Sequence, residues 1–233
     1  MWGVLAHDGM RGRWQPEEFF AHGRSEVDAL MTQLQMAGVD PPRDRVLDFG
    51  CGVGRLSFAL ADRFERVVGV DISRPMLDGA GRYNRLGDRC QFFLYNGEDL
   101  SLFPDQSFSA VVSLMTLQHV PPAAATVYLS EMVRVLRPGG VLAVQIPAER
   151  RQSNLSPWRR LRRGIRTSLD LAIRRPPRME MHAMPIEEVA AVIEAAGADI
   201  AGVIPDGRAG EWGESVLHVA VRRAPDRAGP PLA

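Results

Sequence analysis

Residues 45–54 read RVLDFGCGVG, a short apolar run that ends in glycines at alternate positions, Gly50, Gly52 and Gly54. Such a run is typical of a buried parallel strand, and the glycines let the next loop pass close beneath a ligand, where a Cβ atom would collide. A second apolar run, residues 66–71, ends in Asp71, 21 residues after Gly50. A carboxylate there can accept hydrogen bonds from both hydroxyls of a ribose. The two runs therefore predict a nucleoside-binding edge of an open sheet.

The rest of the chain continues this alternation of strands and helices. Helical patterns cover residues 14–37, 54–64, 73–85, 122–135 and 185–196, with Ser73 expected as an N-cap. Further strand patterns cover residues 90–96, 108–114, 141–146, 198–204 and 215–221. The turn RPGG, residues 137–140, separates the helical pattern 122–135 from the strand pattern 141–146. Strands and helices at this spacing predict a doubly wound α/β sheet.

Composition narrows the class of protein. The chain has 233 residues, of which 45% are apolar and 24% charged, as in a globular protein and unlike a disordered, collagen-like or disulfide-rich chain. No apolar run approaches the roughly 18–20 residues of a membrane-spanning helix, and the N-terminus lacks the apolar region of a secretory signal. With only two cysteines, Cys51 and Cys90, we expect a reduced, cytoplasmic protein.

The net charge of zero hides an uneven distribution. All 28 basic residues are arginines, and residues 150–178 hold ten of them with one acid, a local net of +9. An amphipathic helix expected over residues 157–175 could bind a phosphate-bearing substrate, an anionic membrane or nucleic acid. It could equally pack against the acidic remainder of its own chain. The sequence leaves these alternatives open.

The glycine loop separates two classes of cofactor. It reads G-x-G-x-G, and Arg55 stands where the dinucleotide fingerprint has its third glycine. Asp48, just before the turn, would repel a pyrophosphate but suits a cationic ligand. Dinucleotide binding is therefore disfavoured.

Five segments, in order, resemble the successive motifs of class I S-adenosylmethionine-dependent methyltransferases of the small-molecule branch: VLDFGCGVGRL, VVGVDIS, NGEDL, FSAVVSLMTLQHV and LRPGGVL. The resemblance covers residues 43–147, with a compatible end at 185–222. It implies a Rossmann-like, seven-stranded, mostly parallel sheet whose last strand is antiparallel, with a helical insert after the fifth strand. It also implies an enzyme that moves a methyl group from S-adenosylmethionine, in line, to an oxygen or nitrogen atom of a small molecule, leaving S-adenosylhomocysteine.

The resemblance also implies how the chain is divided. We expect one domain over residues 1–223, followed by a disordered tail, 224–233. Within the domain we expect an N-terminal helical lid, a cofactor-binding core, the Arg-rich helical insert, and a C-terminal helix with two strands, at residues 1–40, 43–147, 148–184 and 185–223.

The family's cofactor contacts fall on residues at the ends of the first four strands. Asp48 is expected near the methionine ammonium, Asp71 at the ribose, and Asn96 at the adenine amino group. The full set implied by the resemblance is Asp48, Gly50, Cys51, Gly52, Asp71, Ile72, Met76, Asn96, Gly97, Glu98, Ser113 and Leu114.

The acceptor side is less constrained. His119 and His182 are the candidate bases, because a neutral imidazole can take the proton of a nucleophile; a His that only caps or packs is the alternative for His119. Residues expected to line the acceptor site or form the lid are Trp14, Phe20, Arg24, Trp158, Met181 and Trp212, although methionines and an amphipathic helix also serve as ordinary core. The other histidines have no Cys or acid at ligand spacing, so no metal is expected.

Two other functions remain open at this point. An RNA methyltransferase could use the Arg-rich insert to bind phosphates, and a non-catalytic protein could bind the cofactor or a membrane surface. We expect a small acceptor, with acidic or phosphorylated molecules the first to test. Its identity, the methylated atom and the oligomeric state are not encoded in any motif.

Overall fold

The computed structural model describes residues 15–150, 180–209 and 213–224. Most of the expected Arg-rich insert, the expected tail and the tryptophans at 14, 158 and 212 lie outside these residues.

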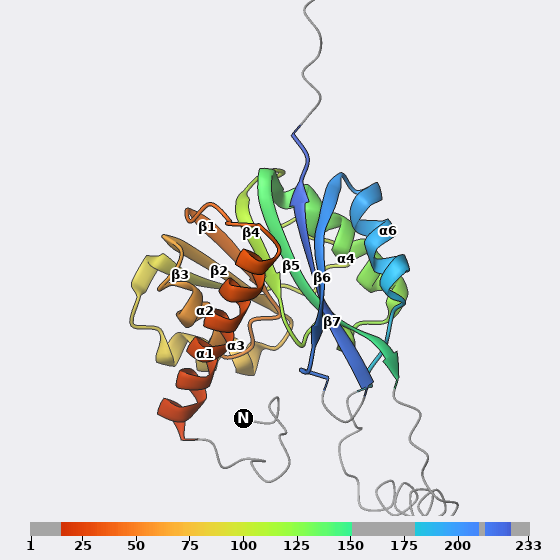
Figure 1. The fold of residues 1–233 in the computed structure, drawn as a ribbon. Helices are drawn as coiled ribbons and strands as arrows, with labels where there is room; N and C mark the ends of the chain where they lie inside the picture. Colours follow the sequence, from red (N-terminus) through yellow and green to blue (C-terminus); the bar gives the residue numbers. More distant parts are fainter. Residues whose placement is uncertain (1–14, 151–179, 210–212, 225–233) are drawn as a thin grey trace, which may run out of the picture.

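Seven strands form a single sheet in the order β3-β2-β1-β4-β5-β7-β6 (Figure 1). They are β1 Arg45–Phe49, β2 Arg66–Asp71, β3 Cys90–Leu94, β4 Phe108–Ser113, β5 Leu136–Arg150, β6 Ala198–Asp206 and β7 Gly213–Arg222. Neighbours among β1 to β5 pair in parallel, whereas β7 lies between β5 and β6 and is antiparallel to both. The predicted doubly wound sheet with an antiparallel last strand is confirmed.

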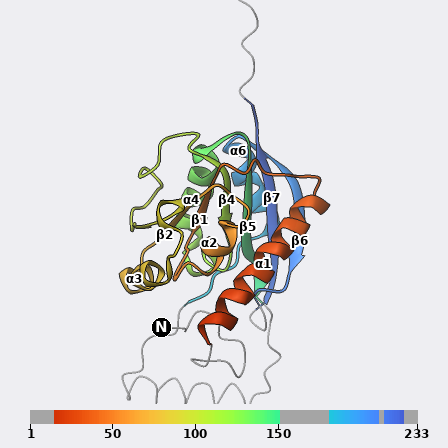
Figure 2. The same ribbon diagram turned by 90° about the vertical axis from the view of Figure 1, so that its left-hand side faces the viewer.

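Helices cover both faces of the sheet. The α-helices are α1 Pro16–Met36, α2 Arg55–Leu60, α3 Arg74–Tyr83, α4 Pro122–Val135 and α6 Ile186–Ala195, and η1 Gly87–Arg89 and η2 Leu117–His119 are 3-10 helices. One buried cluster joins α1 and α2 to the sheet, and a second joins α4 and α6 to its other face (Figure 2). Among the described helices none is long and apolar enough to cross a bilayer.

The structure differs from the sequence prediction at several element ends. β5 begins at Leu136, so the predicted turn RPGG is part of the strand, and its pairing with β4 shifts between Phe108 and Ala110. α2 ends at Leu60 and continues only as turns. Ser73 stands at the N-cap of α3, but its side chain caps nothing there.

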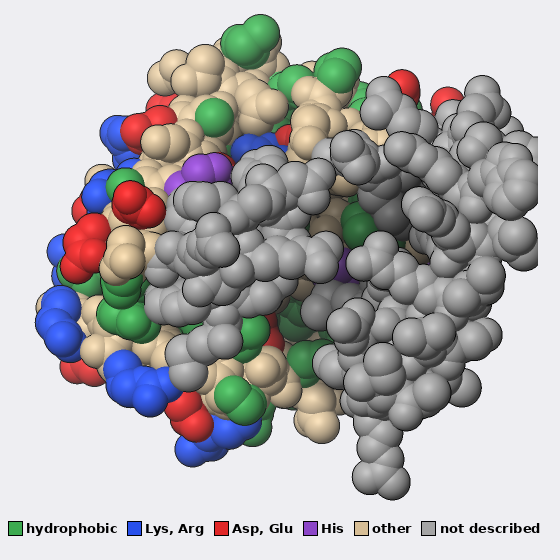
Figure 3. Space-filling model, turned by 90° about the horizontal axis from the view of Figure 1, so that it is seen from below, with side chains coloured by type: hydrophobic (Ala, Val, Ile, Leu, Met, Phe, Trp, Pro, Cys, Tyr) green, Lys and Arg blue, Asp and Glu red, His purple; other side chains and the backbone are tan. Residues whose placement is uncertain are grey.

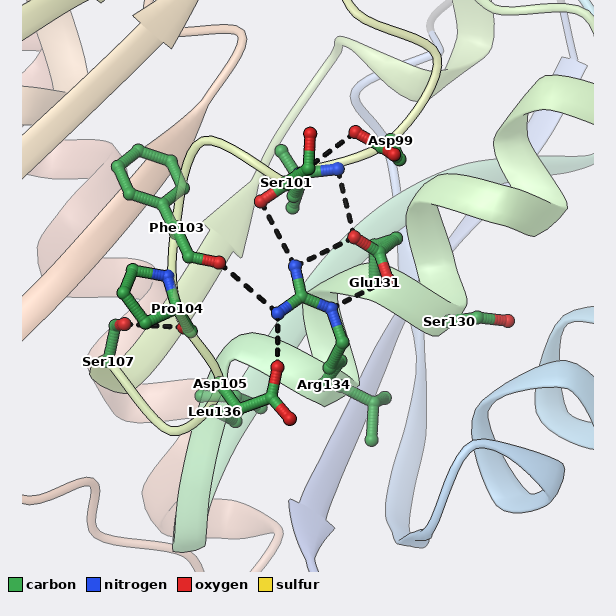
Figure 4. A network of polar contacts seen from close by, with 12 residues as sticks. Asp99, Ser101, Phe103, Pro104, Asp105, Ser107, Ser130, Glu131, Arg134 and Leu136 are labelled. Carbon is green, nitrogen blue, oxygen red and sulfur yellow. Dashed lines mark hydrogen bonds and ion pairs between the residues drawn. The ribbon is translucent and has the colours of Figure 1, made fainter.

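Parallel strands end at the same edge of the sheet, at the bottom of Figure 1, and α1 begins there too. The guanidinium of Arg134, near the end of α4, forms a network of polar contacts with the loop between β3 and β4 (Figure 4). It donates to the carboxylates of Glu131 and Asp105 and to the carbonyl oxygens of Leu100, at 3.0 Å, and Phe103, at 3.2 Å. This network fixes the loop between β3 and β4 to α4.

Candidate active site

The glycine loop after β1 lies at the carboxyl edge. Gly50 and Gly52 have φ angles of +78° and +55°, values that residues with a side chain rarely adopt. A Cβ atom on Gly50 would lie 2.1 Å from Cγ2 of Thr116, so this loop packs closely against the loop that follows β4. At Gly52, in contrast, no atom of the described residues lies within 4 Å of an added Cβ. The loop therefore has an open side at Gly52.

The carboxylate of Asp71, at the end of β2, holds this loop. Its Oδ2 accepts a hydrogen bond from the backbone N–H of Gly52 at 2.8 Å, and its Oδ1 accepts one from the N–H of Ser73 at 2.7 Å. A carboxylate can accept about four hydrogen bonds, so about two remain for a bound diol. Beside it, Ile72 is 74% exposed and Met76 is half-buried, which leaves apolar surface next to the carboxylate. These features fit the ribose and base of a nucleoside.

Asp48 lies deeper, near the end of β1. Its side chain is buried and accepts a hydrogen bond from Oγ of Ser57 at 2.5 Å. Burial raises the pKa of this carboxyl from 3.8 to about 6, against the lowering effect of the Ser57 bond and of the nearby Arg55. A cation bound beside Asp48 would reverse this shift. The neighbouring Cys51 is also buried, and burial raises the pKa of its thiol, so it is not an activated nucleophile.

The loop after β3 carries three predicted residues at the same edge. Asn96 and Glu98 are exposed and Gly97 is half-buried. The hydroxyl of Tyr128, on α4, donates to the carbonyl oxygen of Gly97, and its ring centroid lies 4.9 Å from that of Phe49 at the end of β1. Tyr128 thus contacts two of the predicted cofactor segments, although no motif pointed to it.

The end of β4 is buried. The Ser113 hydroxyl donates to the carbonyl oxygen of Phe49 at 3.2 Å, and Leu114 lies in the core shared with α1 and α2. Met115, the next residue, has a φ angle of +59°. Its N–H donates to Oε1 of Gln145, on β5, at 2.8 Å. Gln145 was missed by the sequence analysis, although a polar residue in the strand VLAVQI could have marked it.

The structure brings the segments of both candidate bases together. The His182 N–H donates to the carbonyl oxygen of Gln118 at 2.7 Å. Nδ1 of His119 lies 3.1 Å from the carbonyl oxygen of Glu180, which can only accept, so Nδ1 carries the proton. Nε2 of His119 then accepts from the amide nitrogen of Gln118 at 3.2 Å. Both ring nitrogens of His119 are therefore paired within the chain.

The methionines of this returning segment differ in their surroundings. Met181 and His182 are half-buried, whereas Met184 is buried in the core against α4 and α6. Met184 is thus a core residue, and Met181 is the methionine placed nearer the surface of this edge. Figure 3 looks onto the edge, where histidine, acidic and apolar side chains of the described residues lie near one another.

The start of α1 packs against the glycine loop. Phe19 clusters with Val53, and the ring of Phe20 meets those of Phe58 and Tyr83 edge-on, with centroids 5.5 and 5.0 Å away. Arg24 is exposed on the surface of α1. Of the predicted lid residues that the structure describes on α1, Phe20 anchors this helix to α2 and α3, whereas Arg24 is exposed.

A buried ion pair adds to this attachment. Nη1 of Arg55, the first residue of α2, forms an ion pair with Oε2 of Glu26 on α1 at 2.7 Å and lies 3.2 Å from Nδ1 of His22. In the sequence, Arg55 is marked only by its departure from the dinucleotide fingerprint.

Comparison with known proteins gives a family-model match described as a methyltransferase domain, over residues 46–140. The chain is 34% identical over 146 residues to the 2-methyl-6-phytyl-1,4-hydroquinone methyltransferase of Synechocystis sp., covering 61% of this chain and 44% of that protein. It is 34% identical over 143 residues to the trans-aconitate 2-methyltransferase of Streptomyces coelicolor, covering 58% of this chain and 45% of that protein. The chain thus spans about half the length of these relatives.

A solved structure is similar in fold to this chain over most of its length. The magnesium protoporphyrin IX methyltransferase of Synechocystis, crystallised with S-adenosylhomocysteine, superposes with a TM-score of 0.61 at 21% identity. The superposition covers 91% of this chain and 89% of that one.

Proposed function

We propose that the chain is a class I S-adenosylmethionine-dependent methyltransferase, an enzyme that methylates an oxygen or nitrogen atom of a small molecule; its match to a methyltransferase-domain model supports this. S-adenosylmethionine supplies the methyl group on a positively charged sulfur. The relatives named for a hydroquinone and for aconitate support a small acceptor.

One observation carries the proposal. The carboxylate of Asp71 accepts the backbone N–H of Gly52 at the carboxyl edge and can accept further hydrogen bonds from a ligand. In the proposed site, Asp71 binds the ribose hydroxyls and the apolar surface of Ile72 and Met76 flanks the adenine. Asn96, Gly97 and Glu98 add polar contacts from the loop after β3. Asp48 faces the ammonium group, with Gly50, Cys51 and Gly52 forming the loop around it, and Ser113 and Leu114 support the end of β4 behind the reacting centre.

The acceptor would bind between this loop and the segment 180–184. Phe20 and Met181 supply apolar contacts there, and α1 limits the access of water. Methyl transfer requires this exclusion of water because its partners react in a desolvated, in-line arrangement. His182 is the candidate base whose ring makes no hydrogen bond to a residue that the structure describes, whereas both ring nitrogens of His119 are paired. His119 could act only by releasing the amide of Gln118 from Nε2.

Calorimetric titration of the purified chain with S-adenosylhomocysteine, with NAD as the matched comparison, tests the proposal. We expect saturable binding of S-adenosylhomocysteine and none of NAD. Binding of NAD alone, or of neither compound, would overturn it. Methylation of small phenols or carboxylates that is insensitive to salt would then separate a small-molecule enzyme from one that binds RNA phosphates.

A further inference from the structure

Gln145 is a fully buried polar residue in the otherwise apolar stretch 141–146 of β5. It follows Val144, which pairs with Ser113, so it lies level with the end of β4 at the carboxyl edge. Ala143 belongs to the core on the α1 and α2 face, and alternate residues of a strand share a face. The Gln145 side chain is therefore on the same face as the glycine loop and α1.

One half of the Gln145 amide has a fixed role. Oε1 accepts the N–H of Met115 at 2.8 Å, and because only the oxygen can accept, this bond fixes the orientation of the amide. It also holds Met115 in its positive-φ conformation. The amide nitrogen, Nε2, must then point the other way.

The other half is unused. Nε2 is buried and has no hydrogen-bond partner among the residues that the structure describes. Buried donors are nearly always paired, so an unpaired one at the edge of a binding site indicates a partner that arrives with the ligand. The surroundings of Gln145 support this reading, because Met115, to which the amide is bonded, packs against the cluster of Phe19 and Val53 at the glycine loop.

We propose that Nε2 of Gln145 donates a hydrogen bond to an oxygen atom of the acceptor, and that the acceptor is therefore an oxygen-bearing molecule, a phenol or a carboxylate, rather than an amine. This inference rests on the proposed function and narrows it. A phenolate, hydroxyl or carboxylate oxygen keeps a lone pair for an N–H while another lone pair attacks the methyl group. A reacting amine nitrogen has a single lone pair, which the methyl transfer uses, and a protonated amine offers only donors. Gln145 is thus a substrate-positioning residue, separate from the groups proposed to hold the cofactor.

Three probes that share one ring test this preference: phenol, benzoate and benzylamine. Each is titrated into the wild-type chain, with and without S-adenosylhomocysteine, while the side-chain amide signals of Gln145 are followed by NMR. These signals are assigned by their loss in Gln145→Met. We expect phenol or benzoate to shift them, and benzylamine to leave them in place.

Affinity gives the second measurement. We expect Gln145→Met to weaken binding of the oxygen probe about tenfold or more, the effect of losing a hydrogen bond to a charged or strongly polar group. Gln91→Met, at an exposed position of β3, is the matched control and should bind the probe like the wild type. Unmoved Gln145 signals in the wild type, or equal affinity in Gln145→Met, would overturn the inference. Failure to bind S-adenosylhomocysteine in the same samples would instead count against the proposed function, since the amide signals report on Gln145 alone.

Discussion

The backbone N–H of Gly52 lies 2.8 Å from Oδ2 of Asp71, so the loop after β1 is fastened to the end of β2. The two residues are 19 positions apart in the chain, and one carboxylate serves both the loop and the proposed ribose site. Cofactor binding and loop geometry are therefore coupled through a single side chain.

Asp71→Asn weakens both roles at once. The asparagine oxygen can still accept one backbone N–H, but the charge and the second acceptor are lost. We expect the affinity for S-adenosylhomocysteine, measured by calorimetry, to fall about tenfold or more. Asp78→Asn is the control, because Asp78 is exposed on α3 and pairs only with Arg74 in the described contacts. Unchanged affinity in Asp71→Asn would remove Asp71 from the site.

Asp48→Asn should have opposite effects on stability and binding. Because the folded-state pKa of Asp48 is raised from 3.8 to about 6, its protonation favours folding below pH 3.8, and that contribution is lost as the pH rises through 6. The variant, which carries no charge, should thus match the wild type at pH 4 and be more stable by about 2–3 kcal/mol at pH 7.5.

Urea denaturation at the two pH values measures this difference, and calorimetry measures binding. If Asp48 faces the ammonium group, the more stable variant should bind S-adenosylhomocysteine more weakly. A variant that gains stability and keeps its affinity would show that Asp48 does not contact the cofactor.

Tyr128→Phe removes one hydroxyl, and with it the bond that holds the Gly97 carbonyl. The ring can still pack against Phe49, so the fold should lose only about 1 kcal/mol. We expect the affinity for S-adenosylhomocysteine to fall about fivefold because the loop after β3 is less well fixed. Ser130→Ala, on the same helix, should leave the affinity unchanged; an equal loss in both variants would point to a general effect on α4.

His119→Ala tests the candidate base. If His119 takes a proton from the acceptor, turnover of a phenol or carboxylate substrate should fall at least tenfold while the affinity for S-adenosylhomocysteine stays the same. Full activity in the variant would leave His119 with its observed role, which is to link Gln118 to the carbonyl of Glu180.

Arg134→Met should lower stability without reaching the proposed site. The guanidinium bonds two carboxylates and two carbonyl groups, and we expect a loss of about 2–4 kcal/mol in urea denaturation at pH 7.5. The Arg134 bond lowers the pKa of Glu131 below its ordinary 4.5, so this contribution is present above pH 4.5 and decreases as the pH falls further. Arg74→Met removes an exposed pair with Asp78 and should cost at most about 1 kcal/mol.

The strands and the main carboxylates could be predicted from the sequence because each depends on local pattern. The apolar runs predict the positions of β1 and β2. Because parallel strands end at the same edge of the sheet, Asp48 and Asp71 come to one edge independently of the side chains between them. RPGG failed as a turn predictor, since its residues join β5 through a shift in pairing that only the neighbouring β4 determines.

The residues that sequence reasoning missed are defined by contacts between distant segments. Tyr128 meets Gly97 across 31 positions, and Gln145 meets Met115 across 30. Neither pairing follows from a motif, because each depends on the register of a strand or the rotation of a helix.

The place of β7 in the sheet has a consequence for synthesis on the ribosome. Among the described residues, β7 follows the other six strands of the sheet in sequence and pairs with both β5 and β6. Until residues 213–222 have emerged, each of these strands presents an unpaired edge that could join another nascent chain. The synthesis of β7 thus sets the moment at which the open edge of β5 and the inner edge of β6 become paired.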